Sequence, residues 1–410
     1  MKCTWRVCYF ESKMLTIPSE CRFMNTLLAY KSNRAFVFAD FVRHPQQYPW
    51  PRSKSYNWPP RTPTPALISG PGFGGPWEEG DTAPRSVSED WFEIVCPPER
   101  RRMINTRDVK PALVNATGTE IFETWQKILL DAPESCLEIQ SADFSEDLHP
   151  QVFDVMLWVS TRVLSLWEDF SNSPVSRLLR ASPIVERVLQ QNERIFHPDD
   201  EEKRSVTDPY SRTLAIHLRR TDYEEHCLKL ANWNSTYYSW DLLDFLPDKF
   251  VPPPGGKIDE NTPENIEIYR KHCWPTHEEI RQRIRDVRND YMEALRISRR
   301  RTHDVDVLYI LTDDTSGWLD DLKGIMANEG WRAIRTNHDL TLDTQGKDVA
   351  MAVDMEIAMR AAVFIGNGVS LPLIPFALPT LTIFRGIPVV FIYKQHCPPT
   401  AGGRKDAHKH

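Results

Sequence analysis

Apolar and polar positions in the second half of the chain form two alternating patterns. Short apolar runs are typical of buried strands, and the longer stretches between them carry apolar residues at helical spacing. The strands are expected at 214–218, 305–312, 331–336 and 362–366. The helices are expected at 277–298, 316–328 and 348–361. This alternation predicts a parallel sheet with right-handed crossovers.

Local signals mark the ends of these helices. Thr276 and Glu279 have the spacing of a capping box, in which the threonine oxygen accepts from an amide of the first turn and the glutamate reaches back. Gly330 is the expected stop of the following helix. Asp313 and Asp314 follow a strand, where they either contact a ribose or cap the next helix, and we favour the cap.

The first half of the chain has a different composition. A short helix at 26–30 and a strand at 35–41 suggest the opening of a Rossmann-like unit. The segment 44–98 is crowded with proline, tryptophan and glycine, which predicts a long irregular loop. Its tryptophans either form a stacking surface for an acceptor or, as we favour, pack the loop onto the domain. Core helices are then expected at 118–130, 152–170 and 174–196, and the polar run 199–204 reads as a linker.

Length and charge limit the class of protein. A chain of 410 residues fits two domains, which we place at 1–204 and 205–393, with a polar tail at 394–410. The net charge of −7 argues against general nucleic-acid binding. Eight cysteines without a CxxC pair make a structural zinc site unlikely and permit disulfides without requiring them. The sequence has no apolar run of membrane-spanning length and no signal-like N-terminus.

The candidate site lies where the strand at 214–218 gives way to a charged loop. Strand alternation puts His217 and Arg219 on one face, with Arg220 and Asp222 just beyond. Ligands of open parallel sheets bind outside the carboxyl ends of the strands. Two guanidiniums there suit a diphosphate, Asp222 could hold one of them, and His217 could donate to a phosphate oxygen.

The string His-x-Arg-Arg-x-Asp at 217–222 resembles the signature of GDP-fucose-dependent fucosyltransferases. That group includes protein O-fucosyltransferases, α1,6-fucosyltransferases and fungal relatives, and Glu224-Glu225-His226-Cys227 with Trp233 is similar to the fungal branch. The resemblance implies a GT-B fold, two Rossmann-like domains with the donor in the cleft between them. It also implies that Arg219 binds the β-phosphate and that the protein works in the secretory pathway.

Further positions follow from the same resemblance. The segment 354–370 keeps the family's aspartate-to-serine interval, so Asp354 is expected to accept from guanine N1 and N2, and Ser370 to meet the phosphates. The glycines at 366 and 368 let that backbone come close to a phosphate. Asn25 matches an asparagine of a glycine-rich loop in the family, although the glycines are missing. Its alternative role is a helix cap or a surface polar group.

Together these features predict a metal-independent fucosyltransferase that needs no cofactor and acts on a glycan or glycoprotein. His217 and Arg219 are the expected catalytic residues; Arg220, Asp222, Asp354, Ser370 and Asn25 are the expected donor-binding residues. Beyond Ser370, three prolines at 371–379 forbid the helix that the family carries there. An inactive relative that binds sugar nucleotide or glycan is therefore one alternative. A transferase of the same fold with another nucleotide sugar is the second.

Overall fold

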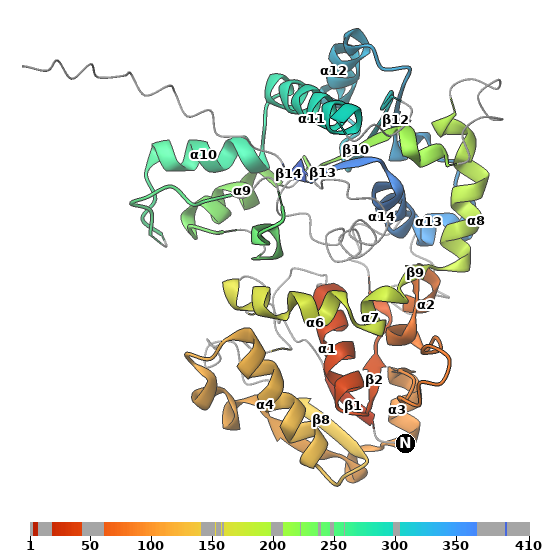
Figure 1. Ribbon diagram of the computed structural model, residues 1–410, viewed down its shortest axis with the longest axis vertical. Coiled ribbons are helices and arrows are strands. Elements are labelled where there is room, and N and C mark those ends of the chain that lie inside the picture. The colour runs from red at the N-terminus through yellow and green to blue at the C-terminus, as the bar shows by residue number, and fades with distance from the viewer. Residues whose placement is uncertain are drawn as a thin grey trace, which may run out of the picture.

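The computed structural model of the protein describes residues 3–6, 19–42, 61–140, 152, 157, 160–197, 208–221, 223–236, 239–246, 250–257, 259–297, 304–366 and 390–391. It is a mixed α/β structure in which each half of the chain contributes a parallel sheet (Figure 1). No helix in the described ranges is long and apolar enough to cross a membrane.

The sheet of the first half has five described strands, all parallel, in the order β6-β2-β1-β8-β7. They are β1 (Cys3–Arg6), β2 (Ala35–Phe38), β6 (Val87–Ser88), β7 (Arg102–Asn105) and β8 (Cys136–Gln140). Helices α1 (Ser19–Lys31) and α4 (Gly118–Asp131) share one apolar cluster with Phe36 and Phe38. Ala35 and Val37 point the other way, toward Phe92 of α3 (Glu89–Val95). The alternation along β2 thus places one helical layer on each face of the sheet.

Short elements complete the first half. The pairs β3 (Phe41–Val42) with β4 (Arg61–Thr62), and β5 (Ile68–Ser69) with β9 (Arg180–Ala181), are antiparallel. The short helices are α2 (Thr64–Leu67), α6 (Trp167–Ser171) and α7 (Pro174–Arg177). The 3₁₀ helices in this half include Pro71–Phe73, Pro98–Arg100, Thr106–Asp108, Lys110–Leu113 and Thr161–Leu166. Trp77 of the irregular loop packs on Tyr30 and donates to the Pro84 carbonyl, so it fixes this loop on the core.

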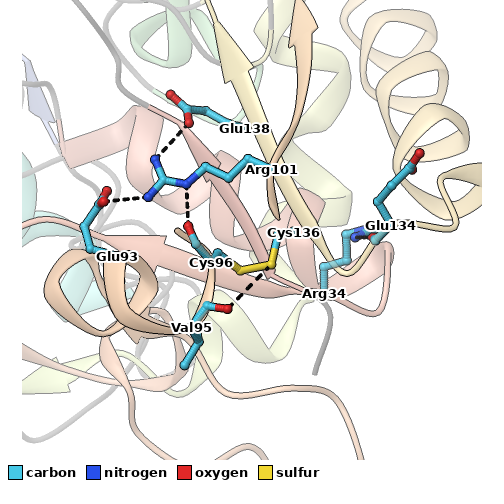
Figure 2. The surroundings of a disulfide bond; sticks show 8 residues. All are labelled: Arg34, Glu93, Val95, Cys96, Arg101, Glu134, Cys136 and Glu138. Atoms are coloured by element: carbon cyan, nitrogen blue, oxygen red, sulfur yellow. Dashed lines mark hydrogen bonds and ion pairs between the residues drawn. A yellow bond between two sulfur atoms is a disulfide. The ribbon is translucent and has the colours of Figure 1, made fainter. Parts of the chain in front are cut away.

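A disulfide between Cys96 and Cys136 ties the end of α3 to β8 (Figure 2). Beside it, the Arg101 guanidinium donates to the Cys96 carbonyl at 2.5 Å and to the carboxylates of Glu93 and Glu138 at 2.5 and 3.0 Å. The side chain of Arg101 is only 6% exposed, so these three acceptors replace the water that its charge loses.

The sheet of the second half also has five described strands, all parallel, in the order β12-β11-β10-β13-β14. They are β10 (Thr213–Leu218), β11 (Val307–Thr312), β12 (Ala333–Thr336), β13 (Val363–Gly366) and β14 (Val390–Phe391). Counted along the chain, this order is 3-2-1-4-5, which is the Rossmann order. The direction of winding reverses between β10 and β13, so the switch point lies beside the end of β10.

Helices cover both faces of this sheet (Figure 1). On one face, α11 (His277–Ile297) and α12 (Gly317–Met326) form an apolar cluster with Leu214, Ile216 and Leu218. On the other, α14 (Ala350–Arg360) packs with Ala215 and Tyr309, and the short α13 (Thr344–Asp348) precedes it. The predicted alternation of residues 214–218 is therefore confirmed. The capping box at Thr276 and the left-handed stop at Gly330 are also present.

A pair of helices is inserted between β10 and α11. Helix α9 (Tyr223–Asn232) packs against α10 (Pro263–Cys273), and a disulfide between Cys227 and Cys273 joins them. Both cysteines belong to a small separate cluster of buried residues that also contains Tyr223 and Tyr269.

Three sequence predictions in the first half need correction. The segment 44–98, predicted to be irregular, contains the helices α2 and α3. The helix predicted at 26–30 begins at Ser19, so Asn25 lies within α1 and not in a loop before it. The single helix predicted at 174–196 is split into α7, β9 and α8 (Pro183–Asn192). Pro183 explains the split, because a proline disfavours helical backbone at the residue before it and is well placed at the start of a new helix.

Helix α8 joins the two halves of the chain. Its N-cap Ser182 donates to the Ala66 carbonyl at 2.5 Å in the first half. Farther along, Asn192 exchanges hydrogen bonds with the backbone of Thr341, and Arg187 pairs with Asp343 at 2.6 Å. The largest apolar cluster likewise contains residues of both halves. The domain boundary at 204 therefore stays a prediction.

Candidate functional site

The candidate site is built around the carboxyl end of β10. His217 is the penultimate residue of this strand, and Arg219 and Arg220 follow it directly. Because the winding of the sheet reverses between β10 and β13, this end borders the crevice where Rossmann-type sheets bind their ligands. The structure thus brings three of the predicted residues together at a suitable place.

His217 is held as a neutral side chain. Burial lowers the pKa of His217 to about 4, the positive charge of Arg219 acts in the same direction, and Asp313 opposes them. Its Nδ1 atom is buried and has no hydrogen-bond partner within the described residues. A neutral imidazole has one donor and one acceptor nitrogen, so His217 can offer a hydrogen bond to a ligand without bringing a charge.

Arg219 and Arg220 both lie against aromatic rings. The guanidinium carbon of Arg219 is 5.4 Å from the centre of the Tyr223 ring. That of Arg220 is 3.8 Å from the Trp274 ring and 4.0 Å from the Trp318 ring, and one of its nitrogens donates to the Pro275 carbonyl at 3.0 Å. Burial lowers the pKa of Arg220 to about 10, so the group remains a cation at neutral pH.

The turn that carries these arginines is fixed by Asp313, at the end of the neighbouring strand β11. Its carboxylate accepts from the backbone amide of Arg220 at 2.8 Å and from the hydroxyl of Thr221 at 2.5 Å. Asp314 accepts from the amide of Ser316, the N-cap residue of α12. The predicted cap is therefore wrong, because Ser316, and neither aspartate, caps α12. Asp314 orders the residue before this helix, while Asp313 orders the arginine turn.

Asp354 lies on α14, above the same face of the sheet as His217. It accepts a hydrogen bond of 2.7 Å from the hydroxyl of Tyr309, which is paired with Ala215 on β10. Ala215 and His217 are two residues apart and so about 7 Å apart along the strand. Burial raises the pKa of Asp354 to about 7, and the Tyr309 hydrogen bond partly offsets this shift.

The described structure does not bring the remaining predicted residues to this site. Asn25 is buried in the middle of α1, in the first half of the chain. Asp222 and Ser370 fall outside the described residues. Glu224 and Glu225 are exposed and pair with Arg270 and Lys229, respectively.

Sequence reasoning missed the aromatic residues that contact the site. Tyr309 sits in the middle of an apolar strand, and its sequence context shows only that it is buried. Trp274 follows α10 and Trp318 opens α12, so they come from segments 44 positions apart. Each tryptophan beside a helix end can be seen in the sequence, but its contact with Arg220 depends on the tertiary fold.

The described residues contain no group of three or more His, Cys, Asp or Glu side chains suited to a metal ion. The expectation of a metal-independent reaction stays a prediction.

Comparisons with known proteins yield solved structures and no sequence relatives. No protein-family model matches the chain, and no curated protein matches it. A crystal structure of POFUT1 in complex with GDP-fucose is 15% identical, with a TM-score of 0.48, over 90% of this chain and 93% of that one. A second crystal form of POFUT1 with GDP-fucose is 14% identical, with a TM-score of 0.45, over 95% and 97% of the two chains. Similarities at this level leave the activity to be argued from the residues of this chain.

Proposed function

We propose that the protein is a glycosyltransferase that transfers fucose from GDP-fucose to a hydroxyl group of a glycan or protein, without a metal ion. The observation that carries the proposal is the position of His217, Arg219 and Arg220 at the switch point of a Rossmann-ordered sheet. The resemblance of the string at 217–222 to the fucosyltransferase signature supplies the identity of the donor.

The reaction needs positive charge at one place. The acceptor oxygen attacks the anomeric carbon of fucose, the bond from that carbon to the β-phosphate oxygen breaks, and GDP leaves with the electron pair. The acceptor loses its proton to a base. Negative charge therefore develops on the β-phosphate, and fixed cations aimed there stabilise the transition state more than the ground state.

Each residue has a defined part in this proposal. Arg219 is the principal partner of the β-phosphate, with Arg220 assisting. His217, neutral at pH 7, donates to a phosphate oxygen. Asp354 accepts from guanine N1 and N2 in its ionised form. Ser370 and Asp222 keep the roles predicted for them.

Replacing one arginine tests the proposal directly. Arg219→Ala should abolish measurable GDP binding in isothermal titration calorimetry, because the phosphate loses its main charge-assisted donor. Arg296→Ala is the matched control, since Arg296 is an exposed arginine of α11 that pairs with Glu293. Normal GDP affinity in Arg219→Ala would overturn the assignment.

A relative that binds the donor without turnover is the second candidate. The prolines at 371–379, which replace a helix expected from the resemblance, favour it. Calorimetry with GDP and an assay of GDP-fucose hydrolysis and transfer separate the two, because only the inactive relative binds without reacting. A thermal-shift screen of GDP-fucose, GDP-mannose and UDP-sugars identifies the donor, because only a bound ligand stabilises the fold.

A further inference from the structure

The Arg220 guanidinium is clamped on both faces. Trp274 and Trp318 lie 3.8 and 4.0 Å from its central carbon, and among the described residues its one hydrogen bond is the one to Pro275. A guanidinium has five N–H donors, all in its plane. Rings that cover its two faces leave the other donors in that plane to point at a ligand.

The clamp joins two parts of the molecule. Trp318 belongs to α12, which packs on the sheet of the second half. It stacks on His277 at the start of α11, with ring centres 4.5 Å apart. Trp274 directly follows α10 of the inserted helical pair. The orientation of Arg220 therefore depends on how this pair is seated on the sheet.

The Cys227–Cys273 disulfide is placed to control that seating. Cys227 lies one helical turn after Tyr223, the residue whose ring contacts Arg219, and Cys273 directly precedes Trp274. The disulfide thus links the segment that carries Tyr223, which contacts Arg219, to the segment that carries Trp274, which contacts Arg220. The cluster around it is small, and small clusters depend on such crosslinks for their stability.

We propose that Tyr223, Trp274 and Trp318 are positioning residues that hold Arg219 and Arg220 toward the donor's diphosphate, and that the Cys227–Cys273 disulfide keeps the first two rings in place. This inference rests on the proposed function. It assigns the three rings to recognition of the phosphates and leaves recognition of the guanine to Asp354. Loss of a ring should weaken binding of GDP and leave binding of guanosine, which has no phosphate, unchanged.

The test compares the affinities of the full-length chain for GDP and for guanosine. Trp274→Leu should raise the Kd for GDP about tenfold, because Arg220 loses one of the two rings that hold it, with the Kd for guanosine unchanged. Trp274→Phe keeps an aromatic face and should recover most of the affinity for GDP. Trp233→Leu is the control, because Trp233 is a half-exposed tryptophan just after α9 whose ring lies against His226.

The outcomes are distinct. Trp274→Leu with wild-type affinity for GDP would overturn the inference, and so would an equal loss for GDP and guanosine, which indicates general disruption. Should Trp274→Leu not fold, Trp318→Leu gives the same readout from the other face of Arg220. Wild-type protein that binds neither ligand would refute the proposed function itself, and the inference with it.

The role of the disulfide is tested with a second matched pair. The double variant Cys227→Ser, Cys273→Ser should lower the affinity for GDP relative to guanosine, as Trp274→Leu does. The double variant Cys96→Ser, Cys136→Ser removes the other described disulfide, in the first sheet, and should leave this ratio unchanged. Equal ratios in the two double variants, measured below both melting temperatures, would show that the Cys227–Cys273 bond does not position the arginines.

Discussion

The phenol of Tyr309 donates a 2.7 Å hydrogen bond to Asp354 and so joins the middle of β11 to α14. Tyr309 is fully buried and Asp354 is partly buried, and burial raises both pKa values, that of Asp354 to about 7 and that of Tyr309 well above its ordinary range. At neutral pH the Asp354 carboxyl is therefore divided between its acid and its anion, while Tyr309 stays a donor.

This division predicts that GDP binding depends on pH. Guanine N1 and N2 are both donors, so the ionised carboxyl is the form that binds them. The ionised fraction rises about tenfold from pH 6 to pH 8 for a pKa near 7, and the Kd for GDP should fall by a similar factor. The terminal phosphate of GDP titrates in a nearby range, so the contribution of Asp354 is the part that Asp354→Asn removes. Identical pH profiles in wild type and Asp354→Asn would contradict this prediction.

Replacing the tyrosine should shift the same profile. The hydrogen bond from Tyr309 stabilises the anion, so Tyr309→Phe should raise the pKa of Asp354 further. The pH at which GDP binding is half maximal should then move upward. A midpoint that stays in place or moves down would show that the hydroxyl does not control the charge of Asp354.

The lowered pKa of His217 predicts that the folded protein loses stability in acid. The folded-state pKa of about 4 lies below the unfolded value near 6.5, so the contribution of His217 is complete above pH 6.5 and is lost as the pH falls toward 4. From pH 7 to pH 5 this amounts to about 2 kcal/mol of unfolding free energy. In urea denaturation, the unfolding free energy of His217→Gln should fall between pH 7 and pH 5 by about 2 kcal/mol less than that of the wild type. Equal losses in the two proteins would exclude a depressed pKa.

A buried ion cluster at the opposite end of the sheet predicts a large effect on stability. Asp306 precedes β11, is only 5% exposed, and pairs with Arg212, before β10, and with Arg332, before β12. Asp306→Ala removes the buried carboxylate that pairs with the buried Arg212 and should cost about 3 to 5 kcal/mol in urea denaturation. Glu293→Gln breaks an exposed pair on α11 and should have little effect. Similar losses in the two variants would contradict this account.

Two glycines should respond in opposite directions to substitution by alanine. Gly324 is exposed within α12 and has open space around it, so Gly324→Ala should stabilise the protein by about 1 kcal/mol through helix propensity. At Gly72, a Cβ atom would lie 2.9 Å from the Thr26 hydroxyl, and Gly72→Ala should destabilise by about 1 to 3 kcal/mol. Thermal melts of the two variants provide the measurement, and stabilisation by Gly72→Ala would show that the 3₁₀ helix at Pro71–Phe73 shifts at little cost.

The second sheet could be predicted from sequence because each of its signals is local. Alternation of residues 214–218, the capping box at Thr276 and the stop at Gly330 each act within a few residues, and all three are present in the structure. In the first half, the helix around Asn25 begins earlier than predicted, at Ser19, although Pro18, Ser19 and Glu20 are residues typical of a helix start. Pro183 marks the break in the sequence, but the continuous helical spacing of apolar residues over 174–196 led to the prediction of one helix.

The candidate site was predictable to the extent that it follows one strand. His217, Arg219 and Arg220 are neighbours in sequence, so β10 alone places them together. Trp274 and Trp318, the partners of Arg220, come from helix ends about 50 and 100 positions away. Tyr309, the partner of Asp354, lies on β11 and not on β10. Such contacts are set by the packing of elements and not by local pattern. A single sequence therefore does not reveal them.

Helix α8 restricts how the two halves of the chain can move. It is bound to Ala66 at its first turn and to Thr341 and Asp343 farther along. A hinge motion that preserves the Arg187–Asp343 and Asn192–Thr341 contacts has to bend before α8, near Ser182 and Pro183. In that motion α8 and α14 would move together as one body relative to the first half of the chain, and Asp354 would move with them.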